Sequence, residues 1–320
     1  MFNLNNTTSA WFPTLRFLNR KKTEFIDPIS KKKMLAHWSF SKLHTSHLPI
    51  QYIQCDFEAF GMIESGFGDS FFFKEASIKG IAEAWERIWM RRLYKEKSDL
   101  PIFSSNGFAS GRDVTHARER SLNELFERSI FLKAWHDQKG WFQHTLNSTF
   151  SRGLDHFLNQ RGWVSRYFCI KEKTLGSVLC GFATNNECGL IFDAKFVGHH
   201  KPSFKIEQKL ITSLSKMVQI HEQIKPNKNF NFPLDGDPLD QMRFYRNVEN
   251  LKALDFLTHE NISSDQLIEL PCHDQTKSKI IFEGSKTLPA VCFSYNEKWP
   301  KLTWGKNSIV GKNPWPHPLA

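Results

Sequence analysis

Two segments of the chain alternate apolar and polar residues with the period of a helix, and both contain Glu-x-x-Glu-Arg. The motif occupies residues 83–87 and again residues 124–128. At about 100° per residue, Glu83, Glu86 and Arg87 fall at roughly 200°, 140° and 240° from Ile81, and the second motif has the same phases. Apolar residues occupy the opposite face of each helix: Ile81, Trp85, Ile88 and Trp89 in the first, and Leu122, Leu125, Phe126 and Ile130 in the second. The pattern therefore predicts two helices, over residues 77–95 and 115–138, each with one buried face and one acidic face.

The remaining pattern predicts strands, turns and two further helices. Strands are expected at residues 49–60, 101–103, 164–170, 177–183, 190–196 and 291–295. Helices are expected at residues 204–223 and 240–257, and a glycine-rich turn at residues 61–70. Residues 1–50 carry weak signals and are predicted to form an irregular arm with a short helix near 32–41. Residues 51–320 are predicted to form a single domain that ends in a proline-rich tail at 312–320.

Composition places the chain among ordinary globular proteins, with 40% hydrophobic and 24% charged residues in 320. No apolar run approaches the ~20 residues of a transmembrane helix, and the first residues do not have the pattern of a signal peptide. We therefore expect a cytoplasmic protein that does not bind a membrane. The six cysteines form no CxxC pair, which favours reduced thiols over disulfides or a zinc site.

A net charge of +10 together with 29 Phe and 10 Trp raises the hypothesis of a nucleic-acid binder. The basic residues are spread along the chain, however, and most aromatic residues lie in apolar patterns, where core packing explains them. A basic surface suits an acidic peptide, a partner protein or a nucleotide equally well. Nucleic acid is therefore the least favoured of these partners.

The acidic helix faces carry the candidate chemistry. If they meet, four carboxylates share one volume: Glu83, Glu86, Glu124 and Glu127. Such a cluster needs cations, and hard oxygen ligands favour Mg²⁺, which often completes its shell with phosphate oxygens. A single Glu-x-x-Glu-Arg is more often a solvated face with an ion pair within the helix. The duplication at matching phase favours a site. The loop at 104–111 adds small residues that would let backbone N–H groups approach a phosphate.

Residues 105–111, with Ala117 and then residues 124–128, resemble the best-marked motif of the YcaO family of ATP-using enzymes, which activate peptide-backbone amides. Residues 80–87 resemble an earlier helix of that family. The loop at 198–200 and the helix that holds Gln219 resemble its third segment. The resemblance covers residues 50–224 and implies an α+β, YcaO-like fold with mixed or antiparallel sheets, in which glutamate-bearing helices enclose a nucleotide site.

The resemblance also implies ATP and Mg²⁺ as cofactors and assigns roles by position. The carboxylates of the metal or phosphate site would be Glu83, Glu86, Glu124 and Glu127. Ser105 and Asn106 would contact the nucleotide, and Arg128 and Gln219 would support catalysis.

The C-terminal prolines suggest a subclass. Pro314, Pro316 and Pro318 form a PxPxP motif, which resembles the C-terminus of azoline-forming YcaO proteins, where the end of the chain enters the active site. Alternating prolines favour an extended rod of low entropy. The resemblance thus adds these prolines to the catalytic residues, and a disordered proline-rich end is the alternative. Leu319 and Ala320 extend past the last proline, which leaves the place of the terminal carboxylate open.

Three positions depart from the family pattern. Lys216 stands where a glutamate is expected, Lys79 stands where a serine is usual, and the usual lysine of the early glycine turn is replaced by Phe67 or Asp69. If the new lysines point inward they would alter Mg²⁺ binding, or they would contact phosphates directly. Two interpretations follow: a divergent active enzyme, which the four retained glutamates favour, or a protein that has lost turnover and acts as a scaffold.

An active enzyme of this kind would form azolines in a ribosomal precursor peptide. The family resemblance implies that a Cys, Ser or Thr side chain attacks the preceding amide, whose oxygen is then phosphorylated by ATP. We expect 320 residues to be too few for a separate leader-binding domain beside a YcaO domain, so a leader-peptide-binding partner protein is expected, with a flavin-dependent azoline dehydrogenase as a further partner. The candidates for a general base are His317, His199 and His200. The run Cys272-His273-Asp274 is interpreted as a loop.

Overall fold

The structure is a computed structural model that describes residues 16–43, 51–70, 72–101, 104–223, 243–257, 267–303, 309 and 311–319. Side chains are not described for residues 16–20, 42–43 and 219–223. Contacts divide the chain into two compact units: unit 1 comprises Met1–Leu125 and Asp274–Glu297, and unit 2 comprises Phe126–His273 and Lys298–Ala320. The predicted single domain over residues 51–320 stays a prediction, and the units are described separately.

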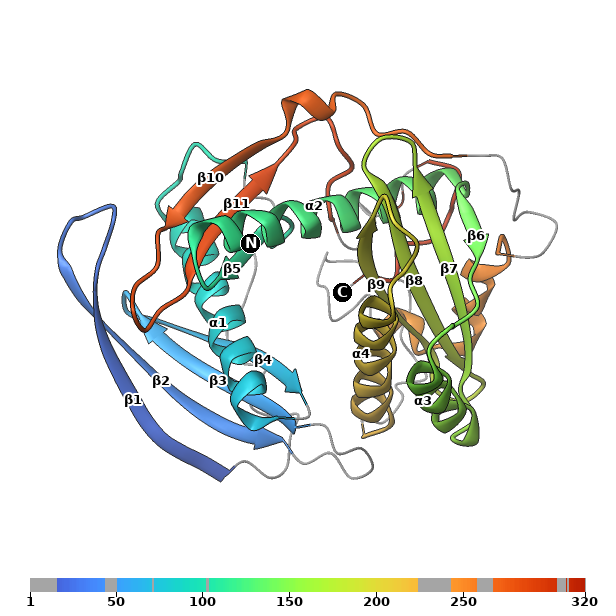
Figure 1. Cartoon of the computed structure of the whole chain (residues 1–320), viewed down its shortest axis with the longest axis horizontal. Coiled ribbons are helices and arrows are strands. Elements are labelled where there is room, and N and C mark those ends of the chain that lie inside the picture. The colour runs from blue at the N-terminus through green and yellow to red at the C-terminus, as the bar shows by residue number, and fades with distance from the viewer. Residues whose placement is uncertain are drawn as a thin grey trace. The chain divides into compact units, whose positions relative to one another are not determined.

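Unit 1 is built on a four-stranded antiparallel sheet with the order β1-β2-β3-β4. Its strands are β1 (Arg16–Ile26), β2 (Lys33–Leu43), β3 (Gln51–Ala59) and β4 (Met62–Ser70). Helix α1 (Phe73–Lys95) lies across one face of this sheet (Figure 1). The apolar stripe predicted for α1 is buried there, because Trp85, Ile88 and Trp89 are fully covered. Burying such large side chains contributes about 1.5–3 kcal/mol each.

The glycines of β4 explain how closely α1 approaches the sheet. A Cβ added at Gly68 would lie 1.8 Å from the carbonyl oxygen of Ala76, and one added at Gly66 would lie 2.2 Å from the amide nitrogen of Ala84. These glycines were predicted to form a turn, and that prediction is wrong for residues 62–70, which are β4. Glycine is required here because the helix backbone occupies the place of a side chain.

We expect Gly68→Ala to lower the free energy of unfolding by about 1–3 kcal/mol, because the methyl group would displace α1 from the sheet. A matched control is Gly153→Ala in α3 (Thr149–Gln160), where no atom lies within 4 Å of the new Cβ. That change should raise the free energy of unfolding by about 0.5–1 kcal/mol. Urea denaturation of both variants measures the difference, and equal effects would contradict the close approach.

A second, three-stranded antiparallel sheet of unit 1 has the order β10-β11-β5. Its strands are β10 (Lys277–Phe282), β11 (Ala290–Tyr295) and β5 (Phe108–Gly111). Helix α2 (Val114–Asp137) begins after β5, where Asp113 accepts a hydrogen bond from the His116 N–H at 2.8 Å and so caps the helix. The first half of α2 packs on this sheet through the Ser121 and Ser294 hydroxyls, 2.5 Å apart.

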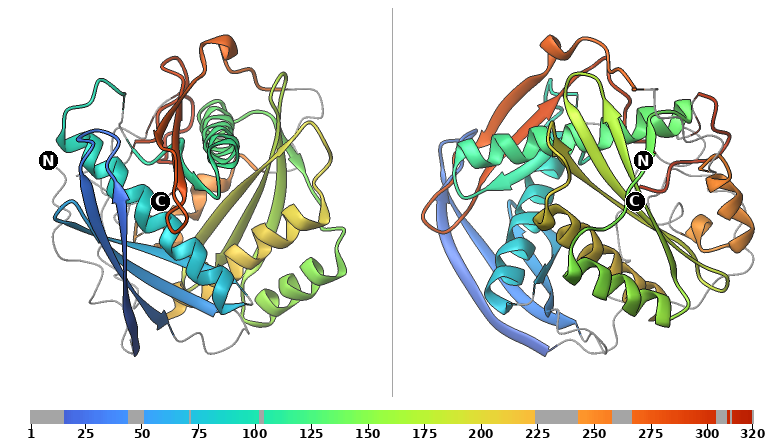
Figure 2. Two further views of the ribbon diagram at one scale, coloured as in Figure 1. Left: turned by 60° about the vertical axis from the view of Figure 1, so that its left-hand side comes forward. Right: turned by 45° about the vertical axis from the view of Figure 1, so that its right-hand side comes forward.

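Unit 2 holds a four-stranded antiparallel sheet with the order β6-β7-β8-β9. Its strands are β6 (Trp141–Gln143), β7 (Val164–Glu172), β8 (Gly176–Asn185) and β9 (Gly189–Gly198). Helices α3 and α4 (Phe204–Gln223) lie side by side on one face (Figures 1 and 2). The second half of α2 covers the other face, where the rings of Phe131 and Phe192 are 4.4 Å apart. Two short 3₁₀ helices follow, η1 (Val248–Leu254) and η2 (His273–Gln275).

The predicted irregular arm at residues 1–50 is wrong for residues 16–43. This segment forms β1 and β2, and β2 pairs with β3 from His37↔Glu58 to Leu43↔Tyr52. The short helix expected near 32–41 is therefore a strand. Side chains of β2 alternate between buried Trp38 and Phe40 and less buried neighbours, which is the period of a strand. The strand expected at 101–103 lies mostly outside the described residues. The helix expected at 240–257 is wrong for residues 246–257, which form the 3₁₀ helix η1 between turns, and residues 240–242 are not described.

Among the described residues, no helix is both long enough and apolar enough to cross a membrane.

Candidate functional site

Side chains on one face of α1 contact the free edge of β4, the outermost strand of its sheet. The residues are spaced by four along the helix, and their backbone partners are spaced by two along the strand, in the opposite chain direction. The contacts are Lys79 Nζ to the Asp69 oxygen at 2.5 Å, the Phe67 N–H to Glu83 Oε2 at 2.7 Å, and Arg87 Nη1 to the Ser65 oxygen at 2.9 Å. This row, which we call the edge row, satisfies backbone groups that would otherwise expose an open strand edge.

The edge row gives Glu83 a structural task. Its second oxygen, Oε1, forms an ion pair with Arg87 Nη2 at 2.6 Å, so both oxygens have partners within unit 1. To bind a metal ion, Glu83 would have to release Arg87 or share an oxygen with it. The proposed metal role thus has weaker geometric support at Glu83 than at the glutamates described next.

The edge row also accounts for Lys79, which departs from the family pattern. Because its ammonium group binds the end of β4, we expect that Lys79→Ser would change any affinity for Mg-ATP by less than about twofold. Loss of one exposed hydrogen bond should lower the free energy of unfolding by at most about 1 kcal/mol. Calorimetry on the variant tests this, and binding strengthened tenfold or more would mean that Lys79 opposes the metal site.

Glu86 is held by the strand that precedes α2. Its Oε1 accepts a hydrogen bond from the Ser110 N–H at 2.6 Å, and Arg120 Nη1 donates to the Ser110 oxygen at 2.6 Å. The side chain is half-buried, and this burial raises the pKa of Glu86, although the charge of Arg120 and the Ser110 N–H oppose the shift. An added cation would therefore stabilise the ionised carboxylate.

Glu127 has the same arrangement in unit 2. Its Oε2 accepts a hydrogen bond from the Phe196 N–H of β9 at 2.8 Å. Burial raises the pKa of Glu127, while the nearby Lys195 charge opposes the shift and Asp193 adds to it. Lys195 itself is 2.8 Å from Asp193 Oδ2, so part of its charge is already balanced.

One geometric rule covers the three glutamates: each projects from a helix and accepts one backbone N–H from a strand. The strand residues are Phe67 for Glu83, Ser110 for Glu86 and Phe196 for Glu127. A neutral N–H fixes one carboxylate oxygen without neutralising the charge, so the group stays oriented and still attracts a cation. Glu124 lies half-buried on α2, one turn before Arg128. No group of three or more His, Cys, Asp or Glu in the described ranges is arranged to hold a metal ion.

The loop before α2 is shorter than the range 104–111 that the sequence predicted. Residues 108–111 form β5, and a Cβ on Gly107 would lie 2.0 Å from the Ser294 oxygen. Packing therefore explains this glycine without a phosphate. Asn106 keeps a feature that suits a ligand: its Oδ1 is buried and has no hydrogen-bond partner within the described ranges. Ser105 lies beside it, and its backbone oxygen accepts the Phe108 N–H at 3.0 Å.

The proline tail packs against unit 2. The Trp315 oxygen accepts a hydrogen bond from Trp135 Nε1 at 3.1 Å, and the Pro316 oxygen accepts one from the Tyr245 hydroxyl. His317 is buried, its Nε2 lies 2.7 Å from the Thr303 oxygen, and burial lowers the pKa of His317 to about 3. As placed here, His317 is neutral with Nε2 engaged, which does not suit a general base. His199 and His200 are exposed.

Two residues of the third motif lie on α4. Lys216 is half-buried, and the backbone of Gln219 is helical while its side chain lies outside the described part of the chain. Sequence reasoning missed Arg120 and Lys195, the basic residues whose charges oppose the rise in the pKa of Glu86 and of Glu127. Neither belongs to a motif, and only the pairing of strand and helix brings them to the carboxylates.

No protein-family model matches the chain, and no curated protein matches it by sequence. Solved structures do match by shape. YcaO from Methanopyrus kandleri bound with AMPPCP and Mg²⁺ has a TM-score of 0.51 at 11% identity, covering 80% of this chain and 84% of that one. The E. coli microcin synthetase McbBCD complex with pro-MccB17 bound has a TM-score of 0.55 at 11% identity, with coverage of 80% and 86%.

A heterocyclase in complex with substrate and cofactor has a TM-score of 0.56 at 11% identity. The match covers 80% of this chain and 49% of the heterocyclase. At this identity the likeness concerns the fold. The antiparallel sheets and glutamate-bearing helices described above therefore make up an α+β fold, and it is the fold of YcaO proteins.

Proposed function

We propose that the chain is an ATP- and Mg²⁺-dependent cyclodehydratase of the YcaO type. Its substrate in this proposal is a ribosomal precursor peptide, and its product carries thiazoline or oxazoline rings. A leader-peptide-binding protein is the proposed partner, with a flavin-dependent azoline dehydrogenase as a further one. The fold likeness to a YcaO bound with AMPPCP and Mg²⁺ and to a heterocyclase bound with substrate and cofactor supports this assignment.

The observation that carries the proposal is the state of Glu86 and Glu127. Each carboxylate has one oxygen fixed by a strand N–H and a pKa raised by burial, so each gains from a bound cation. Carboxylate oxygens held in this way are ligands that suit Mg²⁺, which takes few protein ligands and completes its shell with water and phosphate oxygens. Glu86, Glu124 and Glu127 are each proposed to contribute a carboxylate to Mg²⁺ binding, and so is Glu83 if it releases Arg87.

The proposed chemistry removes the amide oxygen of the peptide. A Cys, Ser or Thr side chain loses its proton and adds to the preceding carbonyl carbon, and the former carbonyl oxygen takes the γ-phosphoryl group of ATP, which releases ADP. Phosphate then leaves and the former amide nitrogen loses its proton as the C=N bond forms. Mg²⁺ would supply the charge that balances the transferring phosphoryl group. Ser105 and Asn106 would orient the nucleotide through side-chain hydrogen bonds, and Arg128 and Gln219 would hold the site together. Pro314, Pro316 and Pro318 are further proposed catalytic residues, by their resemblance to the C-terminal motif of azoline-forming YcaO proteins.

A second candidate is a scaffold that has lost turnover, and two observations favour it. Glu83 is engaged in the edge row, and Lys216 occupies the position of an expected glutamate. The two functions differ in a direct assay with the purified chain, the leader-binding protein and the precursor peptide. The enzyme hydrolyses ATP with Mg²⁺ when the peptide is present and removes one water from the peptide per ring. A stable complex without hydrolysis supports the scaffold.

A further inference from the structure

One side of β7 is only partly paired. β8 pairs with β7 along its whole length, from Val164 to Glu172, but β6 on the other side reaches only from Ile170 to Phe168. One more bond joins the two segments, from the His144 N–H to the Tyr167 oxygen at 2.9 Å. Beyond Tyr167, no strand in the described ranges pairs with the outer side of β7.

The register identifies the backbone groups that this leaves open. Backbone groups of successive residues in a strand point to opposite sides. Because the Tyr167 oxygen faces β6, the N–H and oxygen of Ser165 face the same outer side. The Val164 oxygen points the other way, since it accepts a hydrogen bond from the Thr184 hydroxyl of β8 at 3.3 Å. Among the residues that the structure describes, the Ser165 N–H and oxygen therefore have no backbone partner, and one such donor and acceptor are what an added antiparallel strand requires.

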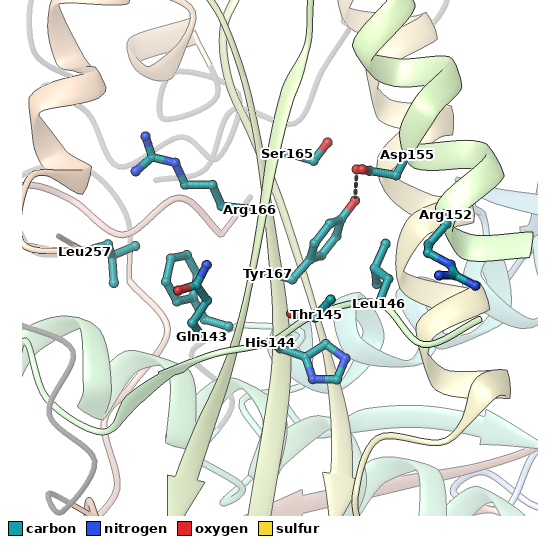
Figure 3. Close-up of a pocket in the computed structure, with 11 residues that line it drawn as sticks. Gln143, His144, Thr145, Leu146, Arg152, Asp155, Ser165, Arg166, Tyr167 and Leu257 are labelled. Carbon is teal, nitrogen blue, oxygen red and sulfur yellow. Dashed lines mark hydrogen bonds between the residues drawn. The ribbon is translucent and has the colours of Figure 1, made fainter. Parts of the chain in front are cut away.

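A pocket of about 630 Å³ lies along this open edge (Figure 3). It is formed where the chain leaves β6 at Thr145 and Leu146, between α3 and the strand. The Tyr167 hydroxyl donates to Asp155 Oδ1 of α3 at 2.7 Å and ties the helix to β7. The pocket is thus a built feature of unit 2 whose wall includes the free edge itself.

Two arginines line this pocket on opposite sides of β7. Figure 3 shows Arg166 on one side of the strand and Arg152, on α3, on the other. Both side chains are exposed, and neither has an ion-pair or hydrogen-bond partner among the residues that the structure describes. The acidic residue of the pocket, Asp155, is bonded to Tyr167. The charge available to a ligand is therefore positive on both sides of the edge.

We propose that this pocket is a docking site for an extended acidic peptide segment, which adds to β7 as a strand. The peptide residue opposite Ser165 would exchange both backbone hydrogen bonds with it. Its side chain would point toward α3 and Arg152, and the next side chain would point toward Arg166. Acidic residues at two successive positions thus meet one arginine each. This inference rests on the proposed function, because the acidic segment would belong to the precursor peptide and would bind to unit 2. Binding at this pocket requires neither ATP nor Mg²⁺.

The experiment uses the full chain and short fluorescein-labelled peptides in which Val and Thr alternate around a central Glu-Glu pair. Fluorescence anisotropy measured without nucleotide should show saturable binding of the Glu-Glu peptide. The matching Lys-Lys peptide should bind at least about tenfold more weakly. Arg166→Glu and Arg152→Glu should each weaken Glu-Glu binding about tenfold, while the exposed Lys205→Glu, with the same change in net charge, should have little effect.

Backbone N-methylation of the peptide separates strand addition from charge attraction without altering the protein. Two peptides are compared, one methylated on the odd-numbered residues and one on the even-numbered residues. One should lose binding and the other should bind almost as well as the unmethylated peptide, because only one set of N–H groups faces β7. Equal loss in both methylated peptides, equal binding of the Lys-Lys peptide, or no saturable binding would overturn the proposal. So would competition by millimolar phosphate alone, which would indicate a simple anion site. Each of these results would leave the assay for ATP hydrolysis unaffected.

Discussion

Glu127→Gln and Glu86→Gln should each lower peptide-stimulated, Mg²⁺-dependent ATP hydrolysis by about 100-fold or more, which corresponds to at least ~2.7 kcal/mol of transition-state stabilisation. The physical reason is the loss of a charged oxygen that is held in place by a strand N–H. Glutamine preserves the acceptor for the Phe196 or Ser110 N–H, so the fold should be retained. The initial rate of phosphate release with saturating peptide measures the effect.

These two variants also carry an internal check on folding. Because burial raises the pKa of both carboxylates, removing the charge should leave the free energy of unfolding of the ligand-free chain unchanged or slightly higher. A variant that loses activity but keeps or gains stability shows that the carboxylate contributes to catalysis and not to folding. Glu119→Gln, at an exposed position on the same helix as Glu127, is the matched control and should keep full activity. Equal activity in all three variants would contradict the assigned roles.

Arg92→Ala should lower the free energy of unfolding by about 3–5 kcal/mol. Arg92 Nη1 and Nη2 bind the two oxygens of Asp27 at 2.7 Å each, and the two side chains are 9% and 2% exposed. The alanine variant leaves the Asp27 carboxylate buried without its main partner. It also removes the cation–π contact with Phe60, whose ring centre is 3.9 Å from the guanidinium carbon.

The neighbouring residue provides the control for this prediction. Arg91 forms an ion pair with Glu64 at 2.6 Å, but these side chains are 27% and 17% exposed, so Arg91→Ala should cost about 1 kcal/mol or less. Urea denaturation at neutral pH compares the two. Similar losses in both variants would mean that burial of the Arg92–Asp27 pair has no special effect.

The same pair predicts a pH dependence. Burial alone would raise the pKa of Asp27, but hydrogen bonds from Arg92, Ser30 and Ile29 outweigh it and hold that pKa well below its usual range. The pair therefore contributes full stability above the unfolded pKa of about 3.9 and loses it as pH falls further. The fall in stability below pH ~4 should be steeper in the wild type than in Arg92→Ala, because the variant lacks the interaction that acid removes.

Periodicity predicted α1 and α2 well because the apolar stripes of both bury large side chains, but it missed α3. Trp85, Ile88 and Trp89 are covered in α1, and Leu125 and Ile130 are covered in α2. Strands β7, β8 and β9 also lie where alternation placed them. In these segments one local pattern agrees with one packing environment, and no distant partner is needed to determine the structure.

Other features could not be predicted because their cause lies in a distant segment. Gly66 and Gly68 suggest a turn in isolation, and only the backbone of α1 against them explains why they lie in a strand. The arm at residues 16–43 becomes strands because it pairs with β3. The partner of Lys79 is likewise a backbone oxygen at the end of β4. The sequence alone could not show this contact, so it could not explain why a lysine stands where the family pattern has a serine.

The candidate site divides in the same way. Sequence reasoning selected Glu83, Glu86 and Glu127, and each accepts a strand N–H in the structure, but their differing surroundings were not visible in the motif. Two identical Glu-x-x-Glu-Arg runs give one glutamate paired with arginine and two whose pKa is raised by burial. The metal roles of all four glutamates are proposals, and the Glu86 and Glu127 variants above test two of them.

Calorimetric titration of ATP into the purified chain, with and without Mg²⁺, tests the central claim most directly. The account predicts saturable binding that requires Mg²⁺ and is weakened at least about tenfold in Glu127→Gln, with Glu119→Gln unchanged. Binding that is absent, or that is the same in Glu127→Gln and independent of Mg²⁺, would contradict it.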